Sequence, residues 1–286
     1  MIRRWPNKDE ARELRDIGRS FVESADSLRE QLTIAQRRFS KLSPQNDLSP
    51  RVREASEIFF PYFLRSMAAA TKLLSIEEHF AAGAVARKAL EIMYALRIIA
   101  RRGDSGVQLV EVVGTRNVAG VHRKTIETVR KLKSNEHHGL DLNAAREHAR
   151  ASLRKIKKVV PNGDTSRVEA RDLAEWAELL SFHDRVYAQL NVCAHFDAVE
   201  ALDLASERSG GPLIQASVAR RYSNVARACA EIMSWALNTA ESFGDAAAGP
   251  VLRALSDAIR SADQRESAHL LRFAALMPQF VTAAGE

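Results

Sequence analysis

The sequence predicts an all-α protein, an elongated helical bundle, and three observations support this fold class. Only 13 glycines and 8 prolines occur among 286 residues, too few for the frequent turns of an all-β chain. Most long segments repeat apolar residues every three or four positions, the spacing of one helix face. Hydrophobic residues make up 46% of the chain, which at this length can form a large buried core.

The first part of the chain predicts three long helices. Residues 8–40 carry an apolar stripe over several turns, and residues 50–74 follow the turn sequence SPQNDLSP. Pro61 is expected to kink or divide the second helix because proline removes a helical hydrogen bond. The most apolar helix spans 76–102 and stops at RRGDSG. For 104–122 a short strand and a helix both fit VQLVEVV, and the helical surroundings favour a helix.

The second part predicts two basic helices, at 120–135 and 142–158, then a loop at VVPNGDTS. A helix over 167–195 follows, and a long helix over 213–243 comes after the loop SERSGGP. A shorter helix over 249–262 leads into a weakly amphipathic tail.

This order of elements predicts a division of the chain. Residues 1–102 and 159–245 would form the bundle core, and 103–158 would be an inserted basic helical subdomain. Residues 246–286 would be a C-terminal helix and tail.

Composition and short motifs exclude several classes of protein. The charged N-terminus MIRRWPNKDEARE does not resemble a signal peptide, and no apolar run reaches the length of about 18 residues needed to span a membrane. Cys193 and Cys229 form no CxxC pair and are predicted to be small buried residues in a reducing compartment. No zinc motif, paired Glu-x-x-His or glycine-rich phosphate loop occurs, so a cytoplasmic protein without a metal or another cofactor is predicted.

Positive charge is concentrated in one part of the chain. Residues 101–158 hold 14 Lys/Arg against 6 Asp/Glu, whereas the whole chain has a net charge of +6. Such a segment attracts polyanions, and RNA or another polyanion is the predicted partner; a solvated helix face is the alternative. The predicted nucleic-acid-binding residues are Arg123, Lys124, Arg130, Lys131, Lys133, Arg154, Lys155, Lys157 and Lys158.

Two apolar helices each carry a row of polar side chains. The helix over 76–102 has Arg87 and Glu91 at i, i+4, on a line with His79 and Gly83. The helix over 167–195 has a matching row, which consists of His183, Tyr187, Asn191 and His195. Because residues four apart stay on one side of a helix, and buried charges need partners, the two rows are expected to face each other or a shared cleft.

These rows resemble a known pattern. Arg87-x-x-x-Glu91, followed roughly a hundred residues later by Tyr187-x-x-x-Asn191-x-x-x-His195, is similar to motifs of the bacterial domain-of-unknown-function family 5677. The resemblance covers about residues 20–240 and implies a helical fold and a site, but no activity. The family often has a proline soon after the histidine, whereas this chain reads HFDAVE.

A looser similarity is to HEPN-type helical ribonucleases, in which an arginine precedes a histidine by a few residues. Arg130 and His137 are separated by six residues in the basic segment. The alternative is a chance match, because arginines and lysines are abundant there.

These residue types suggest phosphodiester chemistry without metal. The predicted catalytic residues are Arg87, Glu91, Tyr187, Asn191 and His195. His195 would move a proton, Arg87 would hold a phosphate, Glu91 would orient Arg87, and Tyr187 and Asn191 would position the substrate or fix the His195 tautomer. The alternative is a buried structural network that fixes helix register.

The leading functional prediction is a nucleic-acid-linked effector, either a metal-independent ribonuclease-like protein or an RNA-binding helical protein. A toxin or phage-defence setting is suggested by analogy only. The rival prediction is a non-enzymatic helical interaction or oligomerisation module, a possible homo-oligomer.

Overall fold

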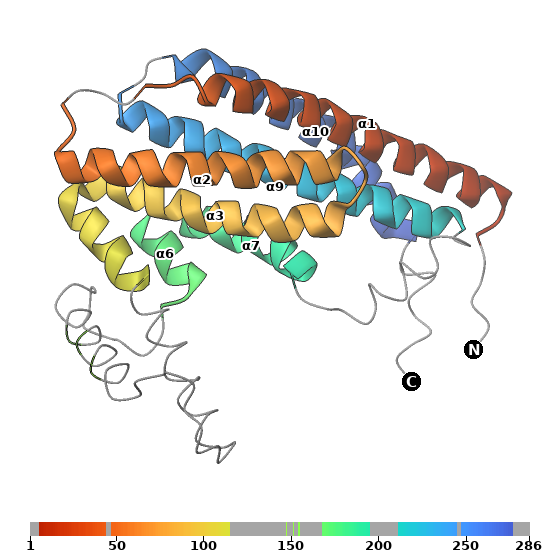
Figure 1. Ribbon diagram of the computed structural model, residues 1–286. Coiled ribbons are helices and arrows are strands. Elements are labelled where there is room, and N and C mark those ends of the chain that lie inside the picture. Colours follow the sequence, from red (N-terminus) through yellow and green to blue (C-terminus); the bar gives the residue numbers. More distant parts are fainter. Residues whose placement is uncertain are drawn as a thin grey trace, which may run out of the picture.

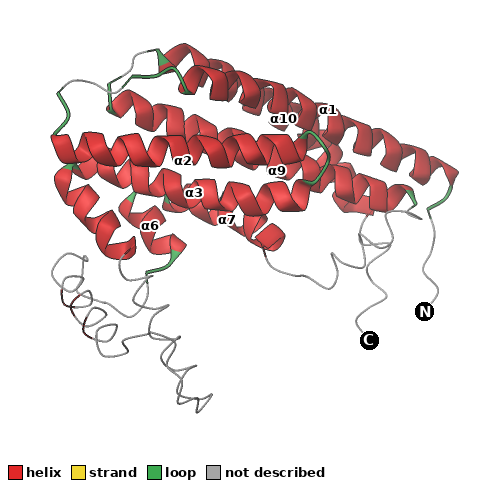
Figure 2. Cartoon of the chain, in the orientation of Figure 1, coloured by secondary structure: helices red, strands yellow, loops and turns green. Residues whose placement is uncertain are grey.

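The computed structural model describes the following residues: 6–43, 47–114, 147, 151, 154, 168–194, 211–244 and 247–276. All regular secondary structure within these ranges is helical (Figure 2). The all-α prediction is therefore confirmed, and the long helices lie side by side as an elongated bundle (Figure 1).

Helix α9 (Pro212–Ser242) lies at the centre of the bundle. Helices α1 (Lys8–Phe39) and α10 (Ala248–Leu276) cover one side of it, and α2 (Pro50–Leu74) and α3 (His79–Arg102) lie on the other (Figure 1). The central position of α9 explains why buried residues occur all round it, since every face meets another helix.

Helix α1 packs against α9 beside Gly18. A Cβ added at Gly18 would lie 3.5 Å from the Cα atom of Ala216, so the two backbones approach closely at this crossing. The apolar stripe of α1 buries Leu14, Ile17 and Phe21, which matches the predicted stripe over 8–40.

Helix α2 is continuous through Pro61. Pro61 is exposed and does not divide the helix, whose core contacts come from Phe63 and Met67 on its buried face.

Two helix ends differ from the prediction because glutamates adopt left-handed backbone conformations. Glu77 has φ 64°, and the N–H of Glu78 donates to the carbonyl of Leu73, so a Schellman motif ends α2 and α3 begins at His79 rather than at residue 76. Glutamate is an unusual residue for this position, where glycine is preferred.

The predicted helix over 167–195 is wrong as a single element, because the structure has two helices there, α6 (Ala170–Trp176) and α7 (Leu180–Ala194). Glu178 has φ 59°, and the N–H of Leu179 donates to the carbonyl of Ala174. This second Schellman motif turns the chain between the helices, and the buried side chain of Leu179 holds the turn against the core.

Helix α10 is longer than the predicted helix over 249–262. The residues up to 276 that were expected to belong to a tail are part of this helix. Phe273 packs edge-on against Phe21 of α1, with ring centroids 6.3 Å apart. A buried glutamate, Glu266, interrupts the apolar face of α10, which explains why the sequence pattern looked weak.

Residues 104–114 are helical, which confirms a helix rather than a strand in that part of 104–122. Val107 and Leu109 are buried against the bundle. The predicted helices over 120–135 and 142–158 lie outside the described residues, except for residues 147, 151 and 154, which are helical. Of the nine predicted nucleic-acid-binding residues, only Arg154 is described, and it is exposed.

Candidate functional site

The two polar rows meet where α3 packs against α7. Tyr94 contacts His183, Arg87 contacts Tyr187, and Gly83 lies against Cys193. In these three contacts the residue numbers of α3 decrease while those of α7 increase, so the two helices run antiparallel. Of the predicted rows, Arg87 and Tyr187 meet each other, whereas His183 pairs with Tyr94, Gly83 lies against Cys193, and His79 lines a separate cavity.

Arg87 and Tyr187 form the exposed edge of this contact. The Nη2 of Arg87 donates a hydrogen bond of 2.6 Å to the Tyr187 hydroxyl, and the guanidinium carbon lies 4.9 Å from the centroid of the tyrosine ring. The Nε of Arg87 is 3.8 Å from Oε1 of Glu91. The side chains of Arg87 and Glu91 remain 23% and 28% exposed, so the guanidinium is held in place while part of the pair stays in contact with solvent.

A second, deeper pair lies beneath Tyr187. The Tyr94 hydroxyl is 3.1 Å from Nδ1 of His183, and the His183 ring stacks on Tyr187 at 4.4 Å and 21°. Burial raises the pKa of Tyr94, with smaller contributions from Tyr187, Glu91 and Asp184. Burial also lowers the pKa of His183. Both pKa shifts are consistent with a protonated Tyr94 hydroxyl that donates a hydrogen bond to the unprotonated Nδ1 of His183.

The lowered pKa of His183 predicts a pH dependence of stability. As the pH falls through the ordinary value of 6.5, the unfolded chain binds a proton at this histidine before the folded chain does. The free energy of unfolding must then decrease. We expect wild-type protein to lose more stability between about pH 7.5 and 5.5 than His183→Gln, measured by urea unfolding at both pH values. Equal losses in the two proteins would contradict this.

The structure brings together three of the five predicted catalytic residues, which are Arg87, Glu91 and Tyr187. Asn191 lies one turn beyond Tyr187 on α7 and is half-buried. His195 lies outside the described residues. Tyr94 was missed by the sequence reasoning, although its position three residues after Glu91 places it near the same helix face.

The two cysteines differ in burial. Cys229 is completely buried, and burial raises the pKa of its thiol to about 12, which disfavours the reactive thiolate. Its predicted role as a small buried residue is confirmed. Cys193 is only half-buried, so the same prediction is wrong for it; its thiol lies where α7 meets Gly83.

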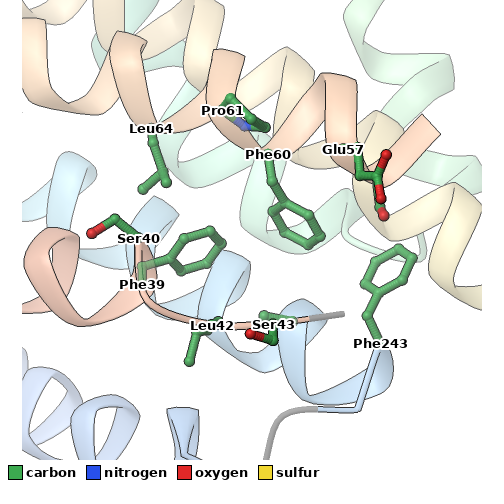
Figure 3. A pocket seen from close by; sticks show the side chains of 11 residues that line it. Phe39, Ser40, Leu42, Ser43, Glu57, Phe60, Pro61, Leu64 and Phe243 are labelled. Carbon is green, nitrogen blue, oxygen red and sulfur yellow. The ribbon is translucent and has the colours of Figure 1, made fainter. Parts of the chain in front are cut away.

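The bundle also contains an apolar pocket of about 250 Å³ between the end of α1, the middle of α2 and the end of α9 (Figure 3). Phe39, Phe60 and Phe243 form its walls, with ring centroids 5.2–5.3 Å apart in successive pairs. The polar side chains of its lining are Ser40, Ser43, Ser56 and Glu57, and Figure 3 labels three of them, Ser40, Ser43 and Glu57. Its chemistry suits a small apolar molecule.

A polar pocket of about 550 Å³ lies between α7, α9 and α10. Its charged side chains pair with one another: Arg185 with Glu231 at 2.6 Å, and Arg227 with Asp263 at 3.0 Å. These ion pairs connect the three helices and satisfy the charges that line the pocket.

Two further properties concern the part of the chain that the structure describes. It holds no group of three or more His, Cys, Asp or Glu residues placed to bind a metal ion. None of its helices combines the length and apolar character needed to cross a membrane.

The chain matches no family model, no curated protein and no solved structure. The resemblances to family 5677 and to the HEPN-type ribonucleases therefore stay predictions that depend on the sequence motifs alone.

Proposed function

We propose that the chain is a nucleic-acid-linked effector, with an RNA-binding or metal-independent ribonuclease-like site built on Arg87 and Tyr187. The observation that supports this proposal is the contact between these side chains. They are a hundred positions apart in the chain, and they meet at the edge of the α3–α7 packing with the guanidinium partly exposed. A fixed, partly exposed arginine is a suitable group for holding a phosphate.

Each side chain has a chemical role in this proposal. Glu91 and Tyr187 restrict the orientation of Arg87, so that little conformational entropy is lost when it binds a phosphate and its developing charge. His195, which enters on the sequence alone, would transfer the proton of a ribose hydroxyl. The basic segment 101–158 would attract the RNA backbone.

Cleavage of a labelled single-stranded RNA in the presence of a chelator tests the proposal. We expect wild-type protein to cut it, and His195→Ala to abolish cleavage with the melting temperature nearly unchanged. Arg87→Lys should reduce cleavage by about tenfold or more, because lysine lacks the planar fork of donors. Arg65→Lys, the same change at an exposed position of α2, is the control and should cleave like the wild type.

Binding gives a second measurement of the same proposal. The dissociation constant for RNA should rise steeply between about 50 and 200 mM salt if phosphate contacts dominate. An affinity that does not change with salt would exclude the basic segment as the binding surface. A wild-type protein that neither binds nor cuts RNA would exclude the proposal as a whole.

The alternative function is a non-enzymatic helical interaction or oligomerisation module. The observation that favours it is the mutual pairing of the described polar groups, Arg87 with Tyr187 and Tyr94 with His183. Such a network can fix helix register without any substrate. In that case Arg87→Ala and Tyr187→Phe would lower stability with a coupling energy of at least about 0.5 kcal/mol, and no RNA activity would be found.

A further inference from the structure

Helix α2 carries contiguous apolar side chains on its exposed face. Ile58 and Tyr62 lie one turn apart and are 61% and 51% exposed, and Pro61 is exposed next to Tyr62. Single exposed apolar side chains are ordinary on a protein surface, whereas contiguous ones mark surfaces that bind another molecule. This face of α2 is therefore a candidate interaction surface.

The exposed residues of this face have the spacing of a helix-packing seam. They follow one another at alternating intervals of four and three positions, which keeps them in line along a partner helix. The line is about 27 Å long at the helical rise of about 1.5 Å per residue. The exposed α2 row consists of Glu54, Ile58, Pro61, Arg65, Ala68 and Lys72.

The two ends of the exposed α2 row carry opposite charges. Glu54 lies at its N-terminal end and Lys72 at its C-terminal end, and neither forms an ion pair with another described residue. A second copy of α2 in the antiparallel orientation would place Glu54 opposite Lys72 at both ends, whereas a parallel copy would place like charges together. The row is therefore complementary to itself in the antiparallel orientation, as a two-fold symmetric interface requires.

The apolar positions of the row match in the same register. With the two-fold axis at residue 63, Ile58 lies opposite Ala68 of the second copy, so a large side chain meets a small one. Ala69 is also exposed beside Ala68, and two small side chains allow the helices to approach closely. Tyr62 lies next to the axis, so the tyrosine rings of the two copies would contact each other and lose their exposure to water.

The centre of the row also satisfies a backbone group. Proline has no N–H, so Pro61 cannot donate the helical hydrogen bond to the carbonyl of Glu57. In the antiparallel register Arg65 of the second copy lies opposite Pro61. Its guanidinium can donate to this carbonyl or to the exposed carboxylate of Glu57.

We propose that the exposed α2 row binds the same row of a second copy of this chain, as an antiparallel and two-fold symmetric helix pair. One pair of helices buries less surface than a typical stable interface, so we expect a weak dimer with a dissociation constant in the micromolar range. The inference goes beyond the proposed function and does not depend on it, because Arg87, Glu91 and Tyr187 lie on α3 and α7.

Sedimentation equilibrium of the whole chain between about 1 and 200 μM tests the proposal, since this range covers weak self-association. We expect the average mass to rise from that of one chain toward that of two. Glu54→Lys and Lys72→Glu should each raise the dissociation constant by about tenfold or more, because each places like charges opposite each other at both ends. Glu23→Lys makes the same change as Glu54→Lys at an exposed position of α1, and it should associate like the wild type.

The double variant Glu54→Lys with Lys72→Glu identifies the orientation. It restores both opposite-charge pairs of the antiparallel dimer, so its dissociation constant should return to within about threefold of the wild-type value. Thermal unfolding confirms that each variant is folded, which is expected because both positions are exposed.

Three results would overturn the proposal: a wild-type chain that stays monomeric up to the highest concentration, a dimer that Lys72→Glu does not weaken, or a double variant as weak as the single ones. The measurement uses no RNA, so its outcome and that of the cleavage experiment are independent.

Discussion

Replacing Glu266 with alanine is expected to lower the free energy of unfolding by about 3 kcal/mol, near the lower end of the range for breaking a buried ion pair. Glu266 of α10 is 1% exposed, and it accepts hydrogen bonds from Ser223 and Arg227 of α9. Alanine would leave Arg227, whose side chain is 15% exposed, without its buried partner. Asp263 still lies 3.0 Å from Nε of Arg227, which is why we expect the smaller loss.

Urea unfolding of two further variants separates this effect from a general loss of charge. Glu266→Gln keeps a carbonyl oxygen for the Ser223 hydroxyl and should lose less stability than Glu266→Ala. Asp257→Ala removes an exposed partner of Arg260, in a pair whose side chains are both 71% exposed, and should change stability by less than about 1 kcal/mol. Similar losses for Glu266→Ala and Asp257→Ala would show that the buried network does not connect α9 and α10.

Gly83→Ala is expected to destabilise the protein by about 1–3 kcal/mol, although the same change inside an exposed helix usually stabilises by up to about 1 kcal/mol. A Cβ at position 83 would lie 2.6 Å from Sγ and 2.7 Å from Cβ of Cys193. Both distances are too short for van der Waals contact, so α7 would have to move away from α3. Because Tyr187 lies on α7, we also expect its contact with Arg87 to be disturbed.

The control is Gly114→Ala, at a helical glycine with nothing within 4 Å of the added Cβ. It should be neutral or slightly stabilising in thermal unfolding. Adding Cys193→Gly to Gly83→Ala should recover part of the lost stability, because it removes both atoms that clash. If Gly83→Ala behaved like Gly114→Ala, the close approach of α3 and α7 would be wrong.

Much of the fold could be predicted because helical periodicity is local. The stripe beginning at Leu14 indicated α1, and the turn sequence before Pro50 located the start of α2. The same periodicity selected Arg87 and Tyr187, whose side chains meet in the structure. Glu77 and Glu178 could not be recognised as helix ends, because only the surrounding packing holds a glutamate in the left-handed conformation.

Some residues of the candidate sites could be selected from the sequence, and others could be recognised only in the structure. Arg87, Glu91 and Tyr187 could be selected by residue type and spacing, whereas Tyr94 acquires its role only because His183 comes within 3.1 Å of it. His79 appeared in the sequence as part of the row with Arg87, yet the structure places it in a separate cavity at the start of α3.

The sequence by itself therefore determined the helical class, the approximate bounds of most helices and the two polar rows, because each depends on spacings of a few residues along one helix. Only the tertiary structure decided where the chain turns at Glu77 and Glu178, how far α10 continues, and which polar atoms are paired or left without a partner. Those features depend on contacts between residues far apart in the chain. The strength of such contacts depends on how deeply the residues are buried, which cannot be read from the spacing of residues along one helix.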